Sequence, residues 1–96
     1  MQRDEILSIL REHQLELDTL GVSSLALFGS VARGDAGPES DIDILVDFAR
    51  PVGLFEFVQL QMRLEALLGR RIDLVTLDAI RDTMRKHILS EAMYAT

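Results

Sequence analysis

Apolar side chains recur along this chain with two different spacings, and each change of spacing marks a new element. Between residues 4 and 19 they recur every three or four positions with charged residues between them, which predicts a helix that ends at Gly21. The same spacing returns over residues 54–68, before Gly69, and again from residue 78 to about residue 92. The pattern therefore predicts three long amphipathic helices.

Three shorter segments have the pattern of strands. Residues 24–28 form a mostly apolar run that is too short for a free-standing helix. Residues 41–48 alternate between two kinds of side chain, carboxylates on one side and large apolar groups on the other. Residues 72–77 form a third run, which the charged side chain of Asp73 interrupts.

The order of these elements defines the expected fold class. A short helix is expected over residues 30–33, so the predicted order is helix, strand, short helix, strand, helix, strand, helix. This order favours an α/β (α+β) fold, a small mixed β-sheet of about three strands with helices packed on one side. With 96 residues, the chain is expected to form a single domain over residues 1–96.

The composition fits a folded, soluble protein and argues against several classes of function. The chain is 48% hydrophobic and 27% charged, which separates it from disordered proteins. Its net charge of -6, without a cluster of Lys and Arg, argues against direct nucleic-acid binding. It has no Cys for a disulfide or a thiolate metal site. No apolar run approaches the ~20 residues of a membrane span, and the N-terminus is unlike a signal peptide, so we expect a cytoplasmic protein.

Asp41 and Asp43 stand two positions apart at the start of the alternating strand. Side chains two apart on a strand project to the same side, so these carboxylates, about 7 Å apart at their backbones, face one region of solvent. Such a pair repels unless a cation lies between its members. Hard oxygen ligands without Cys or a His pair favour Mg²⁺ or Mn²⁺ over Zn²⁺. An Asp-x-Asp pair can also simply begin a strand after a turn, so the pair alone does not establish a metal site.

Gly29 and Ser30 end the preceding strand and open the short helix, a geometry in which backbone N–H groups receive an anion. Glycine lets the backbone approach a phosphate without a Cβ, and the Ser30 hydroxyl adds a donor. Arg33, one turn later, is placed to pair with another phosphate oxygen. A Gly-Ser pair at a strand end is equally an ordinary turn, so this candidate phosphate site depends on the neighbouring Asp pair.

Asp73 is the third candidate, because an unpaired charge is rarely buried within an apolar strand. It must face the open side of the sheet or pair with a cation, for which Arg70 or Arg71 is available. With Asp41 and Asp43 it would complete a site for in-line displacement at phosphorus, in which two metal ions activate a hydroxyl and neutralise a leaving pyrophosphate. In that interpretation Asp73 lies at the metal ion next to the nucleophile and takes its proton.

The segment LFGSVARGDAGPESDIDILVDF, together with RRIDLV around Asp73, resembles the signature of the minimal nucleotidyltransferase (MNT) domain in the DNA polymerase beta superfamily. The resemblance covers nearly the whole chain. It implies a nucleotidyltransferase fold that binds ATP with Mg²⁺, with Gly29 and Ser30 on the triphosphate. It also implies that Asp41, Asp43 and Asp73 are the metal ligands.

Small stand-alone members of this family are typically antitoxins of HEPN/MNT toxin-antitoxin pairs. The resemblance therefore implies transfer of AMP from ATP to a tyrosine hydroxyl of a HEPN-domain toxin, an RNase-like protein that is thereby silenced. Two other hypotheses stay open: an antitoxin that neutralises its partner by steric cover, and a nucleotidyltransferase with a small-molecule acceptor. The three carboxylates favour catalysis over cover, because clustered like charges stabilise nothing without metals. The sequence leaves homo- and hetero-oligomers equally open.

Overall fold

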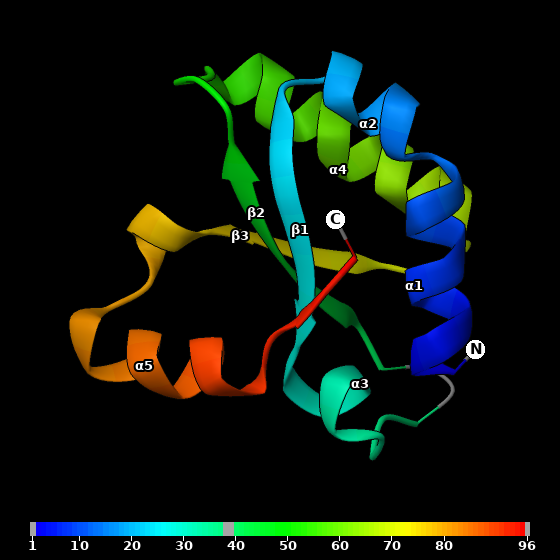
Figure 1. Cartoon of the computed structure of the whole chain (residues 1–96), viewed down its shortest axis with the longest axis vertical. Helices are drawn as coiled ribbons and strands as arrows, with labels where there is room; N and C mark the ends of the chain where they lie inside the picture. The colour runs from blue at the N-terminus through cyan, green and yellow to red at the C-terminus, as the bar shows by residue number, and fades with distance from the viewer. Residues whose placement is uncertain (1, 38–39, 96) are drawn as a thin grey trace.

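The computed structural model describes residues 2–37 and 40–95, and Figure 1 shows their path from the N-terminus to the C-terminus. No helix in this part of the chain has the length and apolar character needed to cross a membrane. The elements, in chain order, are α1 (Arg3–Glu12), α2 (Gln14–Thr19), β1 (Val22–Phe28), α3 (Gly29–Arg33), β2 (Ile42–Phe48), α4 (Leu54–Leu68), β3 (Ile72–Thr76), the 3₁₀ helix η1 (Leu77–Ala79), α5 (Asp82–Glu91) and β4 (Met93–Tyr94).

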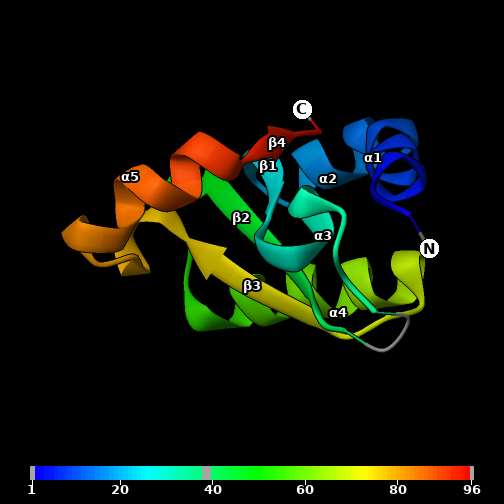
Figure 2. The same ribbon diagram turned by 90° about the horizontal axis from the view of Figure 1, so that it is seen from below.

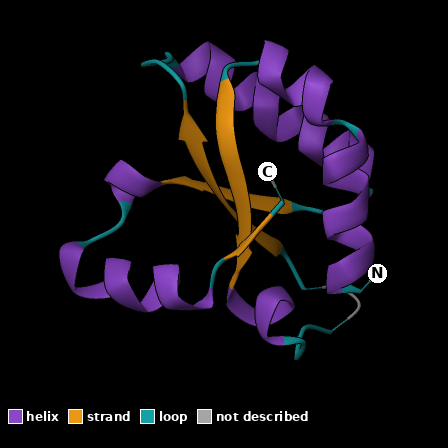
Figure 3. Cartoon of the chain, viewed as in Figure 1, coloured by secondary structure: helices purple, strands orange, loops and turns teal. Residues whose placement is uncertain are grey.

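Four strands form one mixed sheet in the order β3-β2-β1-β4 (Figure 3). β2 lies antiparallel to β1 but parallel to β3, because α4 carries the chain across the sheet between β2 and β3. On its other side β1 pairs with the short strand β4, in which Tyr94 is opposite Ala26. The predicted fold class, a small mixed sheet with helices packed on it, is confirmed, and β4 adds a fourth strand.

The main apolar core lies between the sheet and the helices α1, α2 and α4. Ile42, Ile44 and Val46, at alternate positions of β2, turn to this side and are 0% exposed. Leu60 and Leu64 of α4 belong to the same cluster and are also 0% exposed. Because burial of each such side chain contributes about 1.5–3 kcal/mol, this layer is the main source of hydrophobic stability.

A smaller apolar cluster lies on the other face of the sheet, beneath α5. Ala26 of β1 and Leu45 of β2 project to this face and contact Ile80, which follows η1. Ile88 and Ala92, from α5 and the residue after it, pack against them. Figure 2 shows α4 and α5 on opposite sides of the sheet. α5 therefore covers part of the face that the main core leaves open.

Two predicted helices are divided in the structure. The helix predicted over residues 4–19 breaks at His13, where φ is -104° and ψ is 18°, and α1 and α2 result. The helix predicted from residue 78 to about residue 92 is divided into η1 and α5, and β4 follows at once. The chain becomes extended at Met93 because it pairs there with Leu27 of β1, a contact between distant segments that no local pattern indicates.

Candidate active site

Gly29 lies where β1 ends and α3 begins, directly beside β2. Its φ of 71° is in the left-handed region, which glycine adopts without steric cost. The preceding residue, Phe28, is the register partner of Asp43 in β2. A Cβ on Gly29 would overlap the Oδ2 atom of Asp43, well inside van der Waals contact. Glycine is therefore favoured at this position for two reasons, the left-handed backbone conformation and the close approach of the Asp43 carboxylate.

Ser30 follows within the first turn of α3 and is half-buried. Its carbonyl oxygen accepts a hydrogen bond from the backbone N–H of Asp35 at 3.0 Å, which folds the chain back after the helix. The first N–H groups of a helix lack intrahelical partners, and Phe28, before α3, provides no side-chain cap. The turn at Gly29 and Ser30 therefore offers backbone donors beside a carboxylate.

Asp43 and Asp73 face each other across the parallel strands β2 and β3, as direct register partners. The pKa of the Asp43 carboxyl is raised to about 6, and burial is the largest cause. The charge of Asp73, a hydrogen bond with Asp73 and the charge of Asp41 contribute to the same shift, because each favours a proton on Asp43. The strands thus hold two carboxyl groups together, which costs electrostatic free energy, and a bound cation would lower that cost.

Asp41 lies one residue before β2, and its side chain is 47% exposed. Its Oδ1 atom accepts a hydrogen bond from Nε of Arg71 at 3.1 Å. Arg70 instead donates to the backbone carbonyl of Ser40. The alternative in which Arg70 or Arg71 pairs with Asp73 is therefore not realised, and within the described residues Asp73 has no basic side chain at ion-pair distance.

Arg33, the last residue of α3, is held by two carboxylates. Its Nε donates to Oδ2 of Asp35 at 3.4 Å, and its Nη1 donates to Oε2 of Glu91 at 3.2 Å. The hydrogen bond that Arg33 donates to Asp35 is the largest of the effects that raise the pKa of Arg33. The charge of Arg33 also reaches Asp43, whose pKa it lowers against the larger opposing effects of burial and Asp73.

Sequence reasoning missed Glu91. It lies 58 residues from Arg33, inside an amphipathic helix where a carboxylate is ordinary, and no local pattern distinguishes it. Its side chain is only 22% exposed, less than that of any other carboxylate in the ion pairs of the described residues. Only the packing of α5 against the sheet brings it to α3.

The donor set suits a hard divalent cation, although the observed arrangement is incomplete. Asp43 and Asp73 offer oxygen ligands on one side of the sheet, as Mg²⁺ prefers. Over residues 2–37 and 40–95, no group of three or more His, Cys, Asp or Glu side chains is placed to hold a metal ion. Asp41 would complete such a group by exchanging Arg71 for the cation. The chemistry fits Mg²⁺, and its assignment to these three carboxylates stays a prediction.

The candidate active site is open rather than enclosed. A cleft of about 490 Å³ lies at the far ends of β2 and β3, and Asp47, Arg50 and Asp78 are among its lining residues. None of the six predicted site residues lines it. The site is therefore identified from the register of the strands and the close approach at Gly29, and an acceptor can reach the carboxylates from outside.

The chain matches known proteins over almost all its length. The family described as nucleotidyltransferase domain matches residues 3–95. The protein adenylyltransferase MntA of Thermococcus cleftensis is 45% identical over 92 residues, which cover 95% of this chain and 93% of that protein. A Methanocaldococcus jannaschii protein, also named as a protein adenylyltransferase, is 40% identical over 88 residues, 91% of this chain and 90% of its own.

Solved structures show the same fold. One that is described as a minimal nucleotidyltransferase is 37% identical, with a TM-score of 0.82 over 97% of this chain and 95% of that chain. A toxin-antitoxin structure with AMP-PNP is 23% identical and has a TM-score of 0.71, covering 100% of this chain and 73% of that one. An MNT antitoxin complex with a tri-AMPylated Shewanella oneidensis HEPN toxin is 19% identical, with a TM-score of 0.66 over 94% and 71% of the two chains. With a family match over residues 3–95 and relatives at 40% identity or more, this chain belongs to the nucleotidyltransferase domain family.

Proposed function

We propose that this chain is a Mg²⁺-dependent protein adenylyltransferase that acts as an antitoxin in the cytoplasm, by transferring AMP from ATP to a tyrosine hydroxyl of a HEPN-domain toxin. The observation that carries the proposal is the pairing of Asp43 with Asp73 beside the Gly29 turn. The name of the Thermococcus cleftensis relative supports the activity. The Shewanella oneidensis complex, in which an MNT antitoxin binds an AMPylated HEPN toxin, supports the class of partner.

In the proposed reaction the tyrosine oxygen attacks the α-phosphorus of ATP. A new O–P bond forms while the bond to the leaving pyrophosphate breaks, and the tyrosine proton passes to Asp73. Gly29 and Ser30 bind the triphosphate through backbone N–H groups and a hydroxyl. Arg33 pairs with another phosphate oxygen through the part of its guanidinium that Asp35 and Glu91 leave free.

Asp41, Asp43 and Asp73 are the proposed ligands of the metal. When bound, Mg²⁺ would lower the pKa of the attacking hydroxyl and offset the charge of the leaving pyrophosphate. Asp43 would bind as an ionised carboxylate, and the cation would offset the charge that burial and Asp73 disfavour. Asp41 would turn from Arg71 to the site, a change that breaks one exposed ion pair.

The experiment combines the purified chain with its HEPN partner, ATP and Mg²⁺ and follows the mass of the partner. The expected result is the addition of one or more AMP groups at a tyrosine. Asp73→Ala and Asp41→Ala should abolish the addition, whereas Asp47→Asn, at an exposed carboxylate farther along β2, should retain it. Unchanged addition of AMP by Asp73→Ala and Asp41→Ala would contradict the mechanism.

The same variants separate the two competing hypotheses. If the partner were neutralised by steric cover, Asp73→Ala would still silence the toxin although no AMP is added. If the acceptor were a small molecule, the chain alone would modify that molecule without any HEPN protein. The observed pairing of Asp43 with Asp73 favours catalysis over cover, since holding two carboxylates together, with Asp43 partly buried, costs stability that cover does not require.

A further inference from the structure

Arg33 connects two helices that are far apart in the sequence. α3 and α5 lie side by side at one end of the sheet (Figure 1). Arg33 closes the contact between them through Nη1, which donates to Oε2 of Glu91 at 3.2 Å. The other oxygen of Glu91, Oε1, lies 3.3 Å from Nε2 of His87, one turn earlier on α5. Both oxygens of Glu91 are thus engaged, and their direction is fixed.

The backbone that carries Glu91 is itself firmly placed. Ile88 and Ala92, on either side of it in sequence, pack against the apolar cluster of Ala26, Leu45 and Ile80. Directly after them the chain enters β4 and pairs with β1. Glu91 is therefore a rigid anchor, in contrast to Asp35, whose side chain is 61% exposed in a loop.

The two carboxylates leave part of the Arg33 guanidinium unused. Asp35 accepts a hydrogen bond from Nε and Glu91 accepts one from Nη1, whereas a guanidinium has five N–H donors in one plane. The two N–H groups of Nη2 are used by neither carboxylate, and the plane of the guanidinium fixes the direction in which they point. The charge of Arg33 is felt by Asp43, so the guanidinium lies within electrostatic reach of the carboxylate pair while Glu91 holds it.

We propose that Glu91 is a positioning residue that holds Arg33 so that its remaining donors face the triphosphate of a bound nucleotide. The inference rests on the proposed role of Arg33 in nucleotide binding and extends it to α5, which is not otherwise part of the site. Glu91 acts through geometry rather than charge: a carboxylate near a phosphate is repulsive, and its benefit comes from fixing a flexible side chain before the ligand arrives.

The test measures binding of an ATP analogue with a methylene bridge between the α- and β-phosphorus atoms, in the presence of Mg²⁺, by calorimetry on the full chain. Glu91→Ala should weaken binding about tenfold, because Arg33 then loses its anchor. Glu91→Gln should stay within about threefold of the unmodified chain, because its amide oxygen still accepts from Arg33. Repulsion by charge would give the opposite pattern, with both variants binding more tightly, and that result would overturn the proposal.

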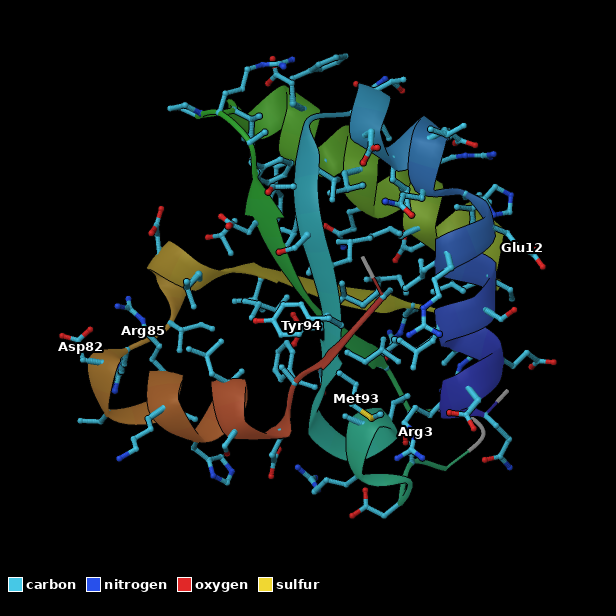
Figure 4. The ribbon with its side chains drawn as sticks, viewed as in Figure 1. Arg3, Glu12, Asp82, Arg85, Met93 and Tyr94 are labelled. Carbon is cyan, nitrogen blue, oxygen red and sulfur yellow. The ribbon has the colours of Figure 1, made fainter. Side chains whose placement is uncertain are left out.

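A double-mutant cycle separates positioning from a general effect on the fold. Arg33→Ala should weaken binding by about tenfold or more, and the combination of Arg33→Ala with Glu91→Ala should be no weaker than Arg33→Ala within about twofold. Multiplied losses in the double variant would mean that Glu91 acts independently of Arg33. Asp82→Asn is the matched control, because Asp82 is an exposed carboxylate that pairs with Arg85 at the other end of α5 (Figure 4).

The readout keeps this inference separate from the proposed function. A chain that binds the analogue with the expected pattern but adds no AMP to a HEPN protein would refute the proposed transfer and support the role of Glu91. A chain that transfers AMP while Glu91→Ala binds the analogue normally would refute only the role of Glu91. A folded chain that does not bind the analogue at all would contradict both.

Discussion

The two faces of β2 show how one strand divides its residues between stability and chemistry. Ile42, Ile44 and Val46 turn to α4 and are fully buried in the main core. Asp43, between Ile42 and Ile44, turns to the opposite face and stands against the carboxyl of Asp73. The first face lowers the free energy of the fold by burying apolar surface, whereas the second raises it by holding like charges together.

The face of β2 that carries Asp43 depends on the apolar face behind it. Asp43 and Asp73 would separate if the register between β2 and β3 could shift, and the apolar residues on the other side fix that register. The free energy that the apolar core contributes therefore offsets the free energy that the carboxylate pair costs. Changes on the active face should remove activity and leave or raise stability, while changes on the core face should lower stability first.

The largest effect is expected from Asp43→Asn. AMP transfer should fall about 1,000-fold, or roughly 4 kcal/mol of transition-state stabilisation, because a proposed metal ligand is lost. At the same time the free energy of unfolding at neutral pH should rise by about 1 kcal/mol, after allowance for solvent screening, because the charge that burial and Asp73 disfavour is removed. Mass spectrometry of the acceptor and urea unfolding measure the two quantities. A loss of both activity and stability would contradict the comparison.

Leu64→Ala tests the core face. Leu64 of α4 is 0% exposed within the main cluster, and its truncation should lower the free energy of unfolding by about 3 kcal/mol. Met62→Ala on the same helix is the control, because Met62 is 64% exposed and should cost less than about 0.5 kcal/mol. Urea midpoints of the two variants provide the measurement, and equal losses would mean that the core is not where the structure places it.

Gly29→Ala tests the point where the backbone meets the active face. The new methyl group would occupy a left-handed backbone position and overlap the Asp43 carboxylate, so we expect a loss of about 2 kcal/mol in stability. Gly34→Ala is a matched control, since Gly34 also has a positive φ, of 82°, but no atom lies within 4 Å of its Cβ position. Gly34→Ala should therefore cost only about 1 kcal/mol. If the two variants lose the same stability by thermal unfolding, the approach of Asp43 to Gly29 is unimportant.

The smallest effect is the dependence of stability on pH without metal. Between the usual value of 3.8 and the raised pKa of about 6, folded Asp43 keeps a proton that the unfolded chain has released. The free energy of unfolding should therefore fall as the pH rises through this window, by about 1 kcal/mol once solvent screening is allowed for. Urea unfolding in EDTA at the two ends of the window measures the change. Subtraction of the Asp43→Asn profile isolates it from other carboxylates, and identical profiles would contradict the assignment.

Much of the fold could be predicted because its signals are local. The period of two over β2 and the helical period over α4 predict those elements close to their observed bounds, since each pattern is repeated within one segment. The prediction was weaker at the ends of the helices. The short strand β4 arises because pairing with β1, a distant segment, overrides a local helical tendency, and the apolar pattern did not indicate the break at His13.

The candidate site, like the fold, could be predicted only in part. Spacing and residue type single out Asp41, Asp43 and Asp73 as candidates, because carboxylates are unusual in apolar strands, and the Gly29 turn is a candidate only through its proximity to them. The sequence did not indicate which arginine pairs with which carboxylate. No cation is closer in sequence to Asp73 than Arg71, yet Arg71 pairs with Asp41.

The sequence by itself determined where β1, β2, β3 and α4 lie to within a few residues, which face of β2 is apolar, and which residue types are available for chemistry at phosphorus. Those properties follow from side chains a few positions apart, whose relation is set by the backbone period. Only the tertiary structure decided that Asp43 stands opposite Asp73, that the C-terminus joins the sheet, and that Glu91 holds Arg33. These contacts join residues far apart in the chain, and they exist only because the apolar faces pack together and fix one register.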